Sequence, residues 1–155
     1  MFDPAAKPQV DPLVASTAVW FDAFVTNVDR TARNPNLLWW HKSLYFIDHG
    51  ASLYFHHDWQ DIEQKAASPF AAIRDHVLLP KATRIDQVAE ELQSRLTSQV
   101  ISEILANVPD AWLLPVQGVP TPEEKRRGYL SYFTRRLNAA SNFVGEALRA
   151  HAGSD

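Results

Sequence analysis

The sequence predicts a mainly α-helical domain with a single β-hairpin. Apolar residues recur at helical spacing over most of the chain, most clearly within 12–26, 83–107 and 122–151. One segment, 37–47, instead has two short apolar and aromatic runs separated by the polar pair Lys42-Ser43, the pattern of a hairpin. A length of 155 residues favours one domain, and 46% hydrophobic residues can form a sizeable core.

The chain is expected to start with a flexible lead-in, residues 1–10, followed by a single domain over 11–155. Proline and alanine dominate the lead-in. Asp11 supplies a capping carboxylate and Pro12 suits the first helical position, so a helix should run from about Pro12 to Thr26. Apolar side chains surround most of this helix, which predicts that it is buried.

The predicted hairpin has strands at 37–41 and 44–47. Both faces of each strand are apolar, so we expect the hairpin to be sandwiched between other elements, with its aromatic residues in the core. Its role in function would be indirect, because its length sets the distance between the polar residues that precede and follow it.

The second half of the chain reads as helices. Residues 51–58 suit a short helix or turn, and 60–79 suit two short helices interrupted near Ser68-Pro69. A long helix, capped by Thr83 or Asp86, should reach about Asn107.

A linker is expected over 108–121, before the last helix. Thr121, Pro122 and Glu124 form a capping-box pattern that should start a final helix running to about His151. The basic residues of this helix are expected to form a solvated face.

Three polar residues flank the hairpin: Asp29 and Asn34 before it, and Asp48 directly after it. One carboxylate can orient or deprotonate an acceptor hydroxyl, while an amide oxygen and a second carboxylate can hold Mg²⁺ against phosphates. In isolation, Asp29 and Asn34 could instead cap a turn. The position of Asp48 at the end of an apolar strand, before Gly50, favours the phosphoryl-transfer interpretation.

These motifs resemble a known family. An Asp-x-x-x-x-Asn loop, a hairpin and an Asp-x-Gly turn are similar to the catalytic and metal-binding loops of the protein-kinase-like superfamily. Asp29-Arg30-Thr31, Asn34-Pro35-Asn36 and Ile47-Asp48-His49-Gly50 are most similar to the HipA-like kinases, and also similar to the phosphatidylinositol-kinase branch. The resemblance covers roughly residues 11–60.

The resemblance implies the helical C-terminal (large) lobe of a kinase. Asp29 would then be the catalytic base, and Asn34 and Asp48 would be Mg²⁺ ligands. Arg30 would contact phosphate or brace the loop, and Asn36 would be a second polar ligand or a turn residue. His49 stands where the familiar Asp-Phe-Gly motif has Phe, which leaves the metal ligand unchanged.

The pattern of a small, phosphate-binding lobe is missing from the sequence. The five glycines are scattered, and no lysine lies in an apolar strand before Asp29. The resemblance therefore implies a Mg-ATP-dependent kinase, phosphorylating Ser or Thr of a protein, whose N-terminal lobe lies in cis or in a separate chain. The alternative is a non-catalytic protein-binding module of the same origin, such as a partner in a toxin–antitoxin pair.

A missing lobe should leave exposed apolar surface through which the chain could also form a homodimer. We expect Phe2, Trp39 or Trp40, Tyr54 and Phe55 to contribute to it.

Composition excludes several classes of protein. A net charge of -3 does not indicate a nucleic-acid or membrane-surface binder, and no apolar run is long enough to span a membrane. The lack of cysteine removes disulfides and thiolate metal sites and fits a cytoplasmic protein. The start of the chain lacks the apolar core of a signal peptide.

A rival site is a hydrolytic transition-metal centre built from clustered histidines and aspartates. Its candidate ligands are His41, His49, His56, His57, Asp48 and Asp58. Helix-spaced pairs are lacking, and the adjacent side chains of His56 and His57 are expected to point in different directions, which disfavours this site.

Overall fold

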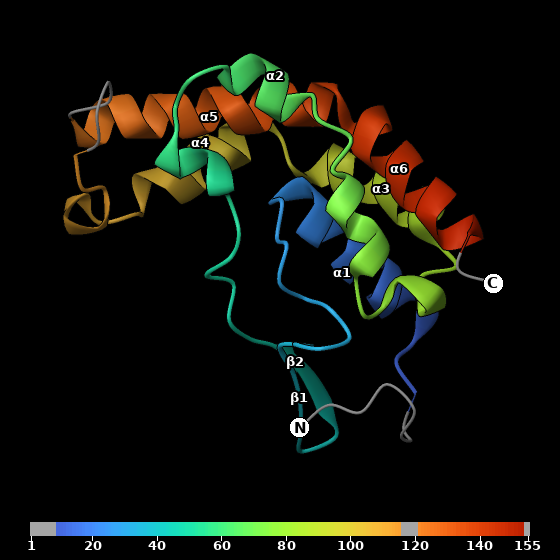
Figure 1. The fold of residues 1–155 in the computed structure, drawn as a ribbon. Coiled ribbons are helices and arrows are strands. Elements are labelled where there is room, and N and C mark those ends of the chain that lie inside the picture. Colours follow the sequence, from blue (N-terminus) through green and yellow to red (C-terminus); the bar gives the residue numbers. More distant parts are fainter. Residues whose placement is uncertain (1–8, 116–120, 154–155) are drawn as a thin grey trace.

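The computed structural model describes residues 9–115 and 121–153, and it confirms a mainly helical fold with one antiparallel hairpin in these residues (Figure 1). The elements are α1 (Pro12–Phe24), β1 (Leu37–Trp40), β2 (Ser43–Phe46), η1 (Tyr54–His57), α2 (Ile62–Ala66), η2 (Ala71–Asp75), η3 (Leu79–Lys81), α3 (Ile85–Arg95), α4 (Ser98–Ala106), η4 (Asp110–Trp112), α5 (Pro122–Asn138) and α6 (Ala140–Ala152), where η denotes a 3₁₀ helix.

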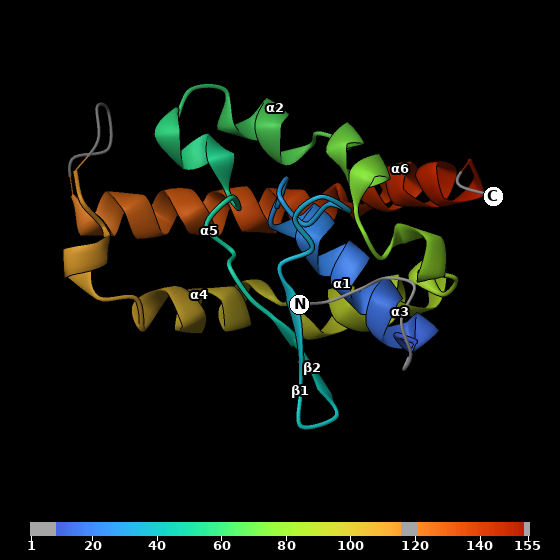
Figure 2. The ribbon, with the colours of Figure 1, turned by 60° about the horizontal axis from the view of Figure 1, so that its bottom comes forward.

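Helix α1 lies at the centre of the fold and packs against α3 and α6 (Figures 1 and 2). It starts as predicted: the Asp11 carboxylate accepts the backbone N–H of Leu13 at 2.8 Å. Trp20 is buried, but Phe21 and Val14 on the other side are 44% and 41% exposed. The expectation that the whole helix is buried is therefore wrong, because α3 and α6 cover one side of it.

The hairpin projects from the helical body (Figures 1 and 2). The prediction that it is sandwiched between other elements is therefore wrong. Strands β1 and β2 pair antiparallel, with Trp40 opposite Ser43. The connecting residues are His41 and Lys42, both with positive φ, so the turn lies one residue earlier than expected.

One face of the hairpin packs against the core through Leu37, Trp39, Leu44 and Phe46. The other face exposes Trp40 (58%) and Tyr45 (44%), because no element of the described chain covers it.

The two long helices that were predicted are each divided in two. The first is divided because Thr97 starts a new helix: its hydroxyl accepts the N–H of Val100 at 3.2 Å. Arg84, rather than Thr83 or Asp86, holds the cap position of α3. The predicted last helix is divided at Ala139, where the backbone leaves helical geometry (φ -101°, ψ 20°), so that α5 ends at Asn138 and α6 begins at Ala140.

The predicted capping box at the start of the last helix is present. The Thr121 hydroxyl accepts from Glu124 N–H at 3.2 Å, and the Glu124 carboxylate accepts from Thr121 N–H at 3.1 Å. The short helices predicted around Ser68-Pro69 are also present, as α2 and η2.

A buried arginine of α5 holds the C-terminal end of α1. The expectation that the basic residues of this helix form a solvated face is wrong for Arg136 and Lys125, which are buried. The guanidinium of Arg136 donates to the carbonyls of Ala23 (2.6 Å) and Phe24 (2.8 Å) at that end of α1. It also donates to the carbonyl of Ala66 at the end of α2 (2.9 Å). Burial lowers the pKa of Arg136, and the carbonyls at the two helix ends favour its charged form. This arrangement fixes the point from which residues 25–36 leave the core.

The segment η2–η3 supports those residues from the opposite side. Ile73, Leu78 and Leu79 are buried in the core beside α1 and α6. The N–H of Val77 donates to the carbonyl of Arg30 at 3.0 Å. The loop after α1 therefore lies between the hairpin and a packed segment.

At the start of the described chain, Val10 is buried in the core, whereas residues 1–8 of the predicted lead-in lie outside the described residues.

In the part of the chain that the structure describes, no helix has both the length and the apolar character needed to cross a membrane.

Candidate functional site

Asp29, Asn34 and Asn36 converge in the loop between α1 and β1. Oδ2 of Asp29 accepts hydrogen bonds from Nδ2 of Asn34 at 2.7 Å and Nδ2 of Asn36 at 3.3 Å. Thr31 tightens the loop, since its N–H donates to the carbonyl of Asn34 at 3.1 Å. This geometry leaves Oδ1 of Asp29 and the side-chain oxygen of Asn34 without a hydrogen bond inside the described protein, so both can accept from a ligand.

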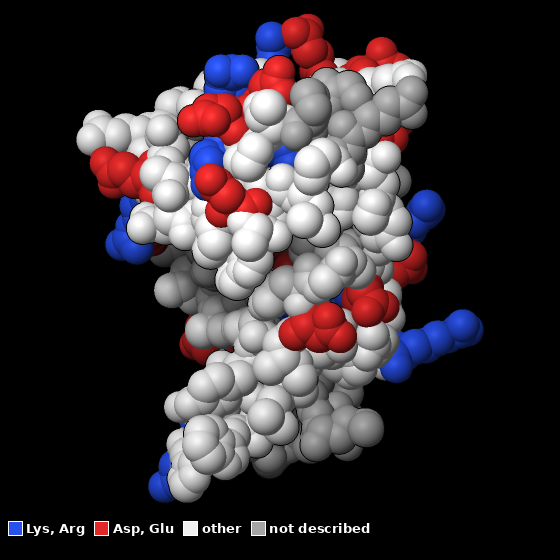
Figure 3. Space-filling view, turned by 90° about the vertical axis from the view of Figure 1, so that its left-hand side faces the viewer, with Lys and Arg blue, Asp and Glu red and all other residues white. Residues whose placement is uncertain are grey.

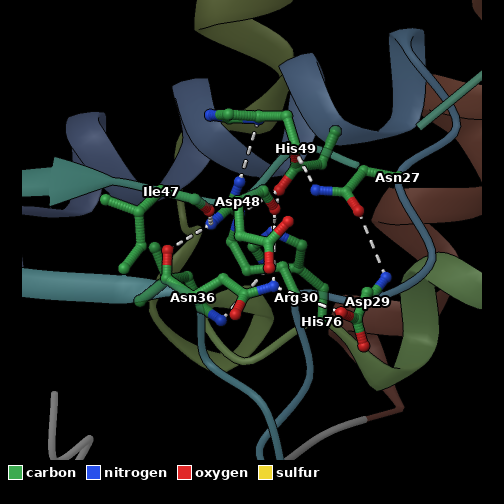
Figure 4. Close-up of polar contacts among 10 residues, drawn as sticks. Asn27, Asp29, Arg30, Asn36, Ile47, Asp48, His49 and His76 are labelled. Carbon is green, nitrogen blue, oxygen red and sulfur yellow. Dashed lines mark hydrogen bonds and ion pairs between the residues drawn. The ribbon is translucent and has the colours of Figure 1, made fainter. Parts of the chain in front are cut away.

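Asp48 lies next to this loop and is joined to it through Asn36 (Figure 4). Nδ2 of Asn36 donates to the backbone carbonyl of Asp48 at 3.4 Å. The Asp48 carboxylate accepts the N–H of Gly50 at 3.3 Å and is exposed to solvent. In the described chain it forms no hydrogen bond with Asp29 or Asn34. The structure therefore brings the two loops together without direct contact between their acidic groups.

Asn36 and Asp48 both have left-handed backbone conformations, with φ of 48° and 49°. Asn and Asp tolerate this region better than most residues because their short side chains bond locally. The two conformations occur where the chain enters and leaves the hairpin. They turn the backbone so that polar atoms from both loops face the same region.

Arg30 connects the two loops from inside the protein. Its buried guanidinium donates to the carbonyl of Asn36 at 2.6 Å and to the carbonyl of Ile47 at 3.4 Å. Its Nη2 lies 3.3 Å from Nδ1 of His49, and the guanidinium lies over the ring of Phe46 at 5.3 Å. All of these groups belong to the protein, so in this geometry Arg30 supports the loops and does not face a phosphate site.

A buried carboxylate that the sequence analysis did not identify lies beneath Arg30. Oδ2 of Asp22 accepts from Nε of Arg30 at 2.5 Å and lies 3.0 Å from Nε2 of His76. Oδ1 of Asp22 accepts from Nδ2 of Asn27 at 3.1 Å, and Oδ1 of Asn27 accepts the N–H of Asp29 at 3.2 Å. Asp22 therefore connects to Asp29 through Asn27 and to the Asp48 loop through Arg30.

The sequence contained one signal for this group. Asp22 is the only charged residue in a mainly apolar helix, and a buried charge requires a partner. Nothing in the sequence pointed to His76, which is 54 residues away.

The surroundings of Asp22 keep it ionised. Burial alone would raise the pKa of this carboxyl group, but the hydrogen bonds from His76 and Arg30 and the charge of Arg30 outweigh burial, so its pKa lies below the ordinary value. A lowered pKa in the folded state means that this group stabilises the fold above the unfolded-state pKa of about 3.9. The stabilisation is lost as the pH falls through the folded-state pKa.

Replacing Asp22 by Asn should destabilise the protein by about 3 kcal/mol at pH 7, because it leaves Arg30 buried without its charged partner. Urea unfolding of both proteins checks this value. The difference should persist down to about pH 4 and shrink below it. An unchanged free energy of unfolding at pH 7 would contradict the assigned role of Asp22.

An apolar groove of about 350 Å³ lies beside these loops. Leu13, Val14 and Phe21 of α1 form one wall, and Phe46 and His49 form the other. His49 contacts Phe21 edge to face, with ring centroids 6.3 Å apart. The exposed side of α1 therefore continues directly to the residue after Asp48.

The predicted exposed apolar patch is present in part. Trp40 is 58% and Tyr54 is 59% exposed, and Trp39 is half-buried. Phe55 is buried instead, because its ring stacks on Tyr132 at 3.8 Å. Phe2 lies outside the described residues. The lower part of Figure 3, over the hairpin, carries few charged side chains.

The histidine cluster does not form a metal centre in the described residues, where no three His, Cys, Asp or Glu side chains are grouped to hold a metal. The expectation that His56 and His57 point apart is wrong: their Nε2 atoms lie 3.0 Å apart, because a 3₁₀ turn brings the two rings together. Burial, His57 and Lys125 together lower the pKa of His56.

Comparison with known protein families places most of the chain in one of them. The family model described as HipA-like kinase matches residues 2–138. The curated proteins gave no match, and neither did the solved structures.

Proposed function

Since this chain belongs to the HipA-like kinase family, we propose that it is the C-terminal, catalytic lobe of a kinase. The reaction is transfer of the γ-phosphoryl group of ATP, with Mg²⁺, to a hydroxyl of a protein Ser or Thr. The observation that carries the proposal is the 2.7 Å hydrogen bond between Asp29 and Asn34, in a loop that is joined to the Asp48 loop. Asn36 donates to the carbonyl of Asp48, and Arg30 donates to the carbonyl of the preceding Ile47. Asp29, Asn34 and Asp48 would supply the base and the two metal ligands that phosphoryl transfer needs.

Asp29 is the proposed catalytic base. Its Oδ2 is held by two side-chain amides, and its backbone N–H is held by Asn27, so the carboxylate has one defined direction. Its Oδ1 has no partner inside the described protein and can accept the proton of an attacking hydroxyl. A base that is fixed in this way loses little orientational entropy when the acceptor binds.

Asn34 and Asp48 are the proposed Mg²⁺ ligands. The hydrogen bond of Asn34 Nδ2 to Asp29 orients its amide so that the oxygen points away from Asp29. The exposed carboxylate of Asp48 supplies a negative oxygen. Two oxygen donors suit Mg²⁺, which usually completes its coordination with water and substrate phosphates. Bound there, Mg²⁺ would neutralise charge on the phosphates.

The chain on its own should bind nucleotide weakly. The proposed ligands are one carboxylate and one amide, and Arg30 is occupied by Asp22 and backbone carbonyls. Titration calorimetry of the isolated chain with Mg-ATP should show a Kd above about 1 mM, because Mg²⁺ depends on phosphate ligands held elsewhere. Micromolar binding would show that the nucleotide site lies elsewhere in this chain.

The apolar groove is the proposed contact for the small, phosphate-binding lobe, in cis or in a separate chain. It lies against His49, directly beside Asp48, and includes the exposed side of α1. Replacing Phe21 by Asp should weaken binding of an added N-terminal lobe from a HipA-like kinase at least tenfold, because it puts a charge into an apolar contact.

Ile104→Asp is the matched control, since Ile104 is 57% exposed on α4, away from the groove. Equal binding of all three proteins would exclude the groove as the contact. Light scattering of the chain alone tests the other use of this surface, a homodimer.

A non-catalytic binding module, such as a partner in a toxin–antitoxin pair, is the second candidate. The exposed apolar face of the hairpin favours it, because such surfaces often bind other proteins. The absence of cysteine is compatible with our proposal that the protein acts in the cytoplasm.

The deciding experiment for the two functions is a chimera in which the N-terminal lobe of a HipA-like kinase precedes residue 9. Transfer of radiolabelled phosphate from Mg-ATP to a protein Ser or Thr would support the kinase. A folded chimera that binds Mg-ATP without transferring phosphate would support the binding module.

A further inference from the structure

We propose that His76 is a positioning residue that sets the geometry of Asp29 and Asp48 together, through Asp22. The inference extends the proposed function, because it names a residue outside both loops on which their alignment depends. It rests on a chain of hydrogen bonds that starts at the buried His76 and divides at the buried Asp22 carboxylate.

The contacts of His76 define its protonated nitrogen. The backbone N–H of Leu78 can only donate, so Nδ1 of His76, 3.1 Å away, must accept. Nε2 lies 3.0 Å from Oδ2 of Asp22, which is ionised and can only accept. Both contacts are satisfied by the neutral ring with its proton on Nε2. His76 therefore donates to Asp22 with a fixed ring orientation.

From Asp22 the contacts follow two routes. Oδ1 accepts from Nδ2 of Asn27, whose side-chain oxygen accepts the N–H of Asp29. Oδ2 accepts from Nε of Arg30, and Nη1 of the same side chain donates to the carbonyls of Asn36 and Ile47. Because one carboxylate serves both routes, a rotation of Asp22 would displace both loops.

His76 itself is held firmly enough to act as a reference point. It is 5% exposed, and its backbone forms a bridge with Thr31. The neighbouring N–H of Val77 donates to the carbonyl of Arg30. The segment after it is buried against α1 and α6, where Nδ1 of His151 lies 2.9 Å from the carbonyl of Leu79. The helical core therefore fixes His76, and His76 sets the positions of the two loops.

Two substitutions separate the contacts of His76. His76→Gln can retain a donor near the Nε2 position and so keep the hydrogen bond to Asp22. His76→Asn retains an acceptor near Nδ1 for Leu78 but cannot reach Asp22. The control is His151→Gln, which removes the contact of the half-buried His151 of α6 with the carbonyl of Leu79, on the segment that follows His76. If His76 only supports that segment, the control should affect the loops as His76→Asn does.

Amide hydrogen exchange, measured by NMR on the full chain, tests the proposal without any phosphotransfer. In His76→Asn, the N–H of Asp29 and the Nε–H of Arg30 should exchange at least about tenfold faster, as the loss of a hydrogen bond to a charged group predicts. His76→Gln and His151→Gln should stay within about threefold of wild type, with amides of α6 unchanged in all variants.

Unchanged exchange at Asp29 and Arg30 in His76→Asn would overturn the proposal. So would equal acceleration in all three variants, or unfolding of His76→Asn, because His76 would then hold the core as a whole. Asn27→Ala provides a second test in a chain that keeps His76: the N–H of Asp29 should exchange faster, while the Nε–H of Arg30 does not. Faster exchange at Nε–H of Arg30 as well would contradict the two separate routes.

Failure of the kinase proposal and failure of the His76 proposal give different results. If the wild-type chimera transfers no phosphate, the proposed function fails, and the exchange pattern still decides the role of His76. If transfer occurs, His76→Asn should reduce kcat at least about tenfold and His76→Gln should restore most of it. Equal kcat values for His76→Asn and wild type would contradict a positioning role.

Discussion

Replacing Asp29 by Asn should lower the single-turnover rate of phosphate transfer in the two-lobe chimera by about 10³-fold, within the range of general-base catalysis. The change removes the proton acceptor but keeps an oxygen for the hydrogen bonds from Asn34 and Asn36. The loop should therefore keep its shape, and the affinity for Mg-ATP should change less than about threefold.

Rapid-quench measurement of the rate and calorimetric titration with Mg-ATP together check this result. Melting temperature is the control for folding. A variant that transfers phosphate at the wild-type rate would exclude Asp29 as the base. A variant that loses folding would show that Asp29 is a structural turn residue, the alternative that the sequence also allowed.

Replacing Asp48 by Asn should weaken Mg-ATP binding at least about tenfold and also lower the transfer rate, because it removes the charged ligand of the ion. Asn can keep the left-handed backbone at this position and the hydrogen bond from Gly50 N–H. The protein should therefore fold with an unchanged or slightly higher melting temperature, since active sites often trade stability for function.

The two variants differ in one measurable respect. Only Asp48→Asn should change nucleotide affinity, so binding isotherms measured side by side separate the two roles. Equal loss of affinity in both would mean that the division into base and metal ligand is wrong.

The sequence predicted those parts of the fold and of the site that depend on neighbouring residues. The start of α1 at Asp11 followed from a capping carboxylate and a proline, and the capping box at Thr121 followed from its spacing. The hairpin followed from two apolar runs around a short turn. Because these signals lie within a few residues, they fixed which polar residues enter and leave the hairpin.

Features that depend on distant contacts were not predictable. His76 meets Asp22 across 54 residues, and only the packing of η2–η3 beside α1 brings them together. The sequence also could not show which face of an apolar element is covered. Phe21 and Trp40 are large apolar residues of the kind usually buried, but they face outward because no described element covers those faces.

The breaks in the long helices were missed for a related reason. Helical periodicity continues through Leu96-Thr97 and through Ala139, but the apolar faces on the two sides of each break pack against different neighbours. Helix α5 packs against α2 and α4, whereas α6 packs against α1 and α3. Periodicity alone does not reveal such a change of partner.

Anomalous scattering from Mn²⁺ in crystals of the chimera with a non-hydrolysable ATP analogue tests the central claim most directly. Mn²⁺ accepts the same oxygen ligands as Mg²⁺ and can be located without ambiguity. We predict one anomalous peak in contact with the side-chain oxygen of Asn34 and the carboxylate of Asp48, with Asp29 outside the coordination shell and facing the γ-phosphate. A Mn²⁺ ion bound elsewhere, with Asp48 turned away from Asn34 and the nucleotide, would contradict the kinase site proposed for this chain.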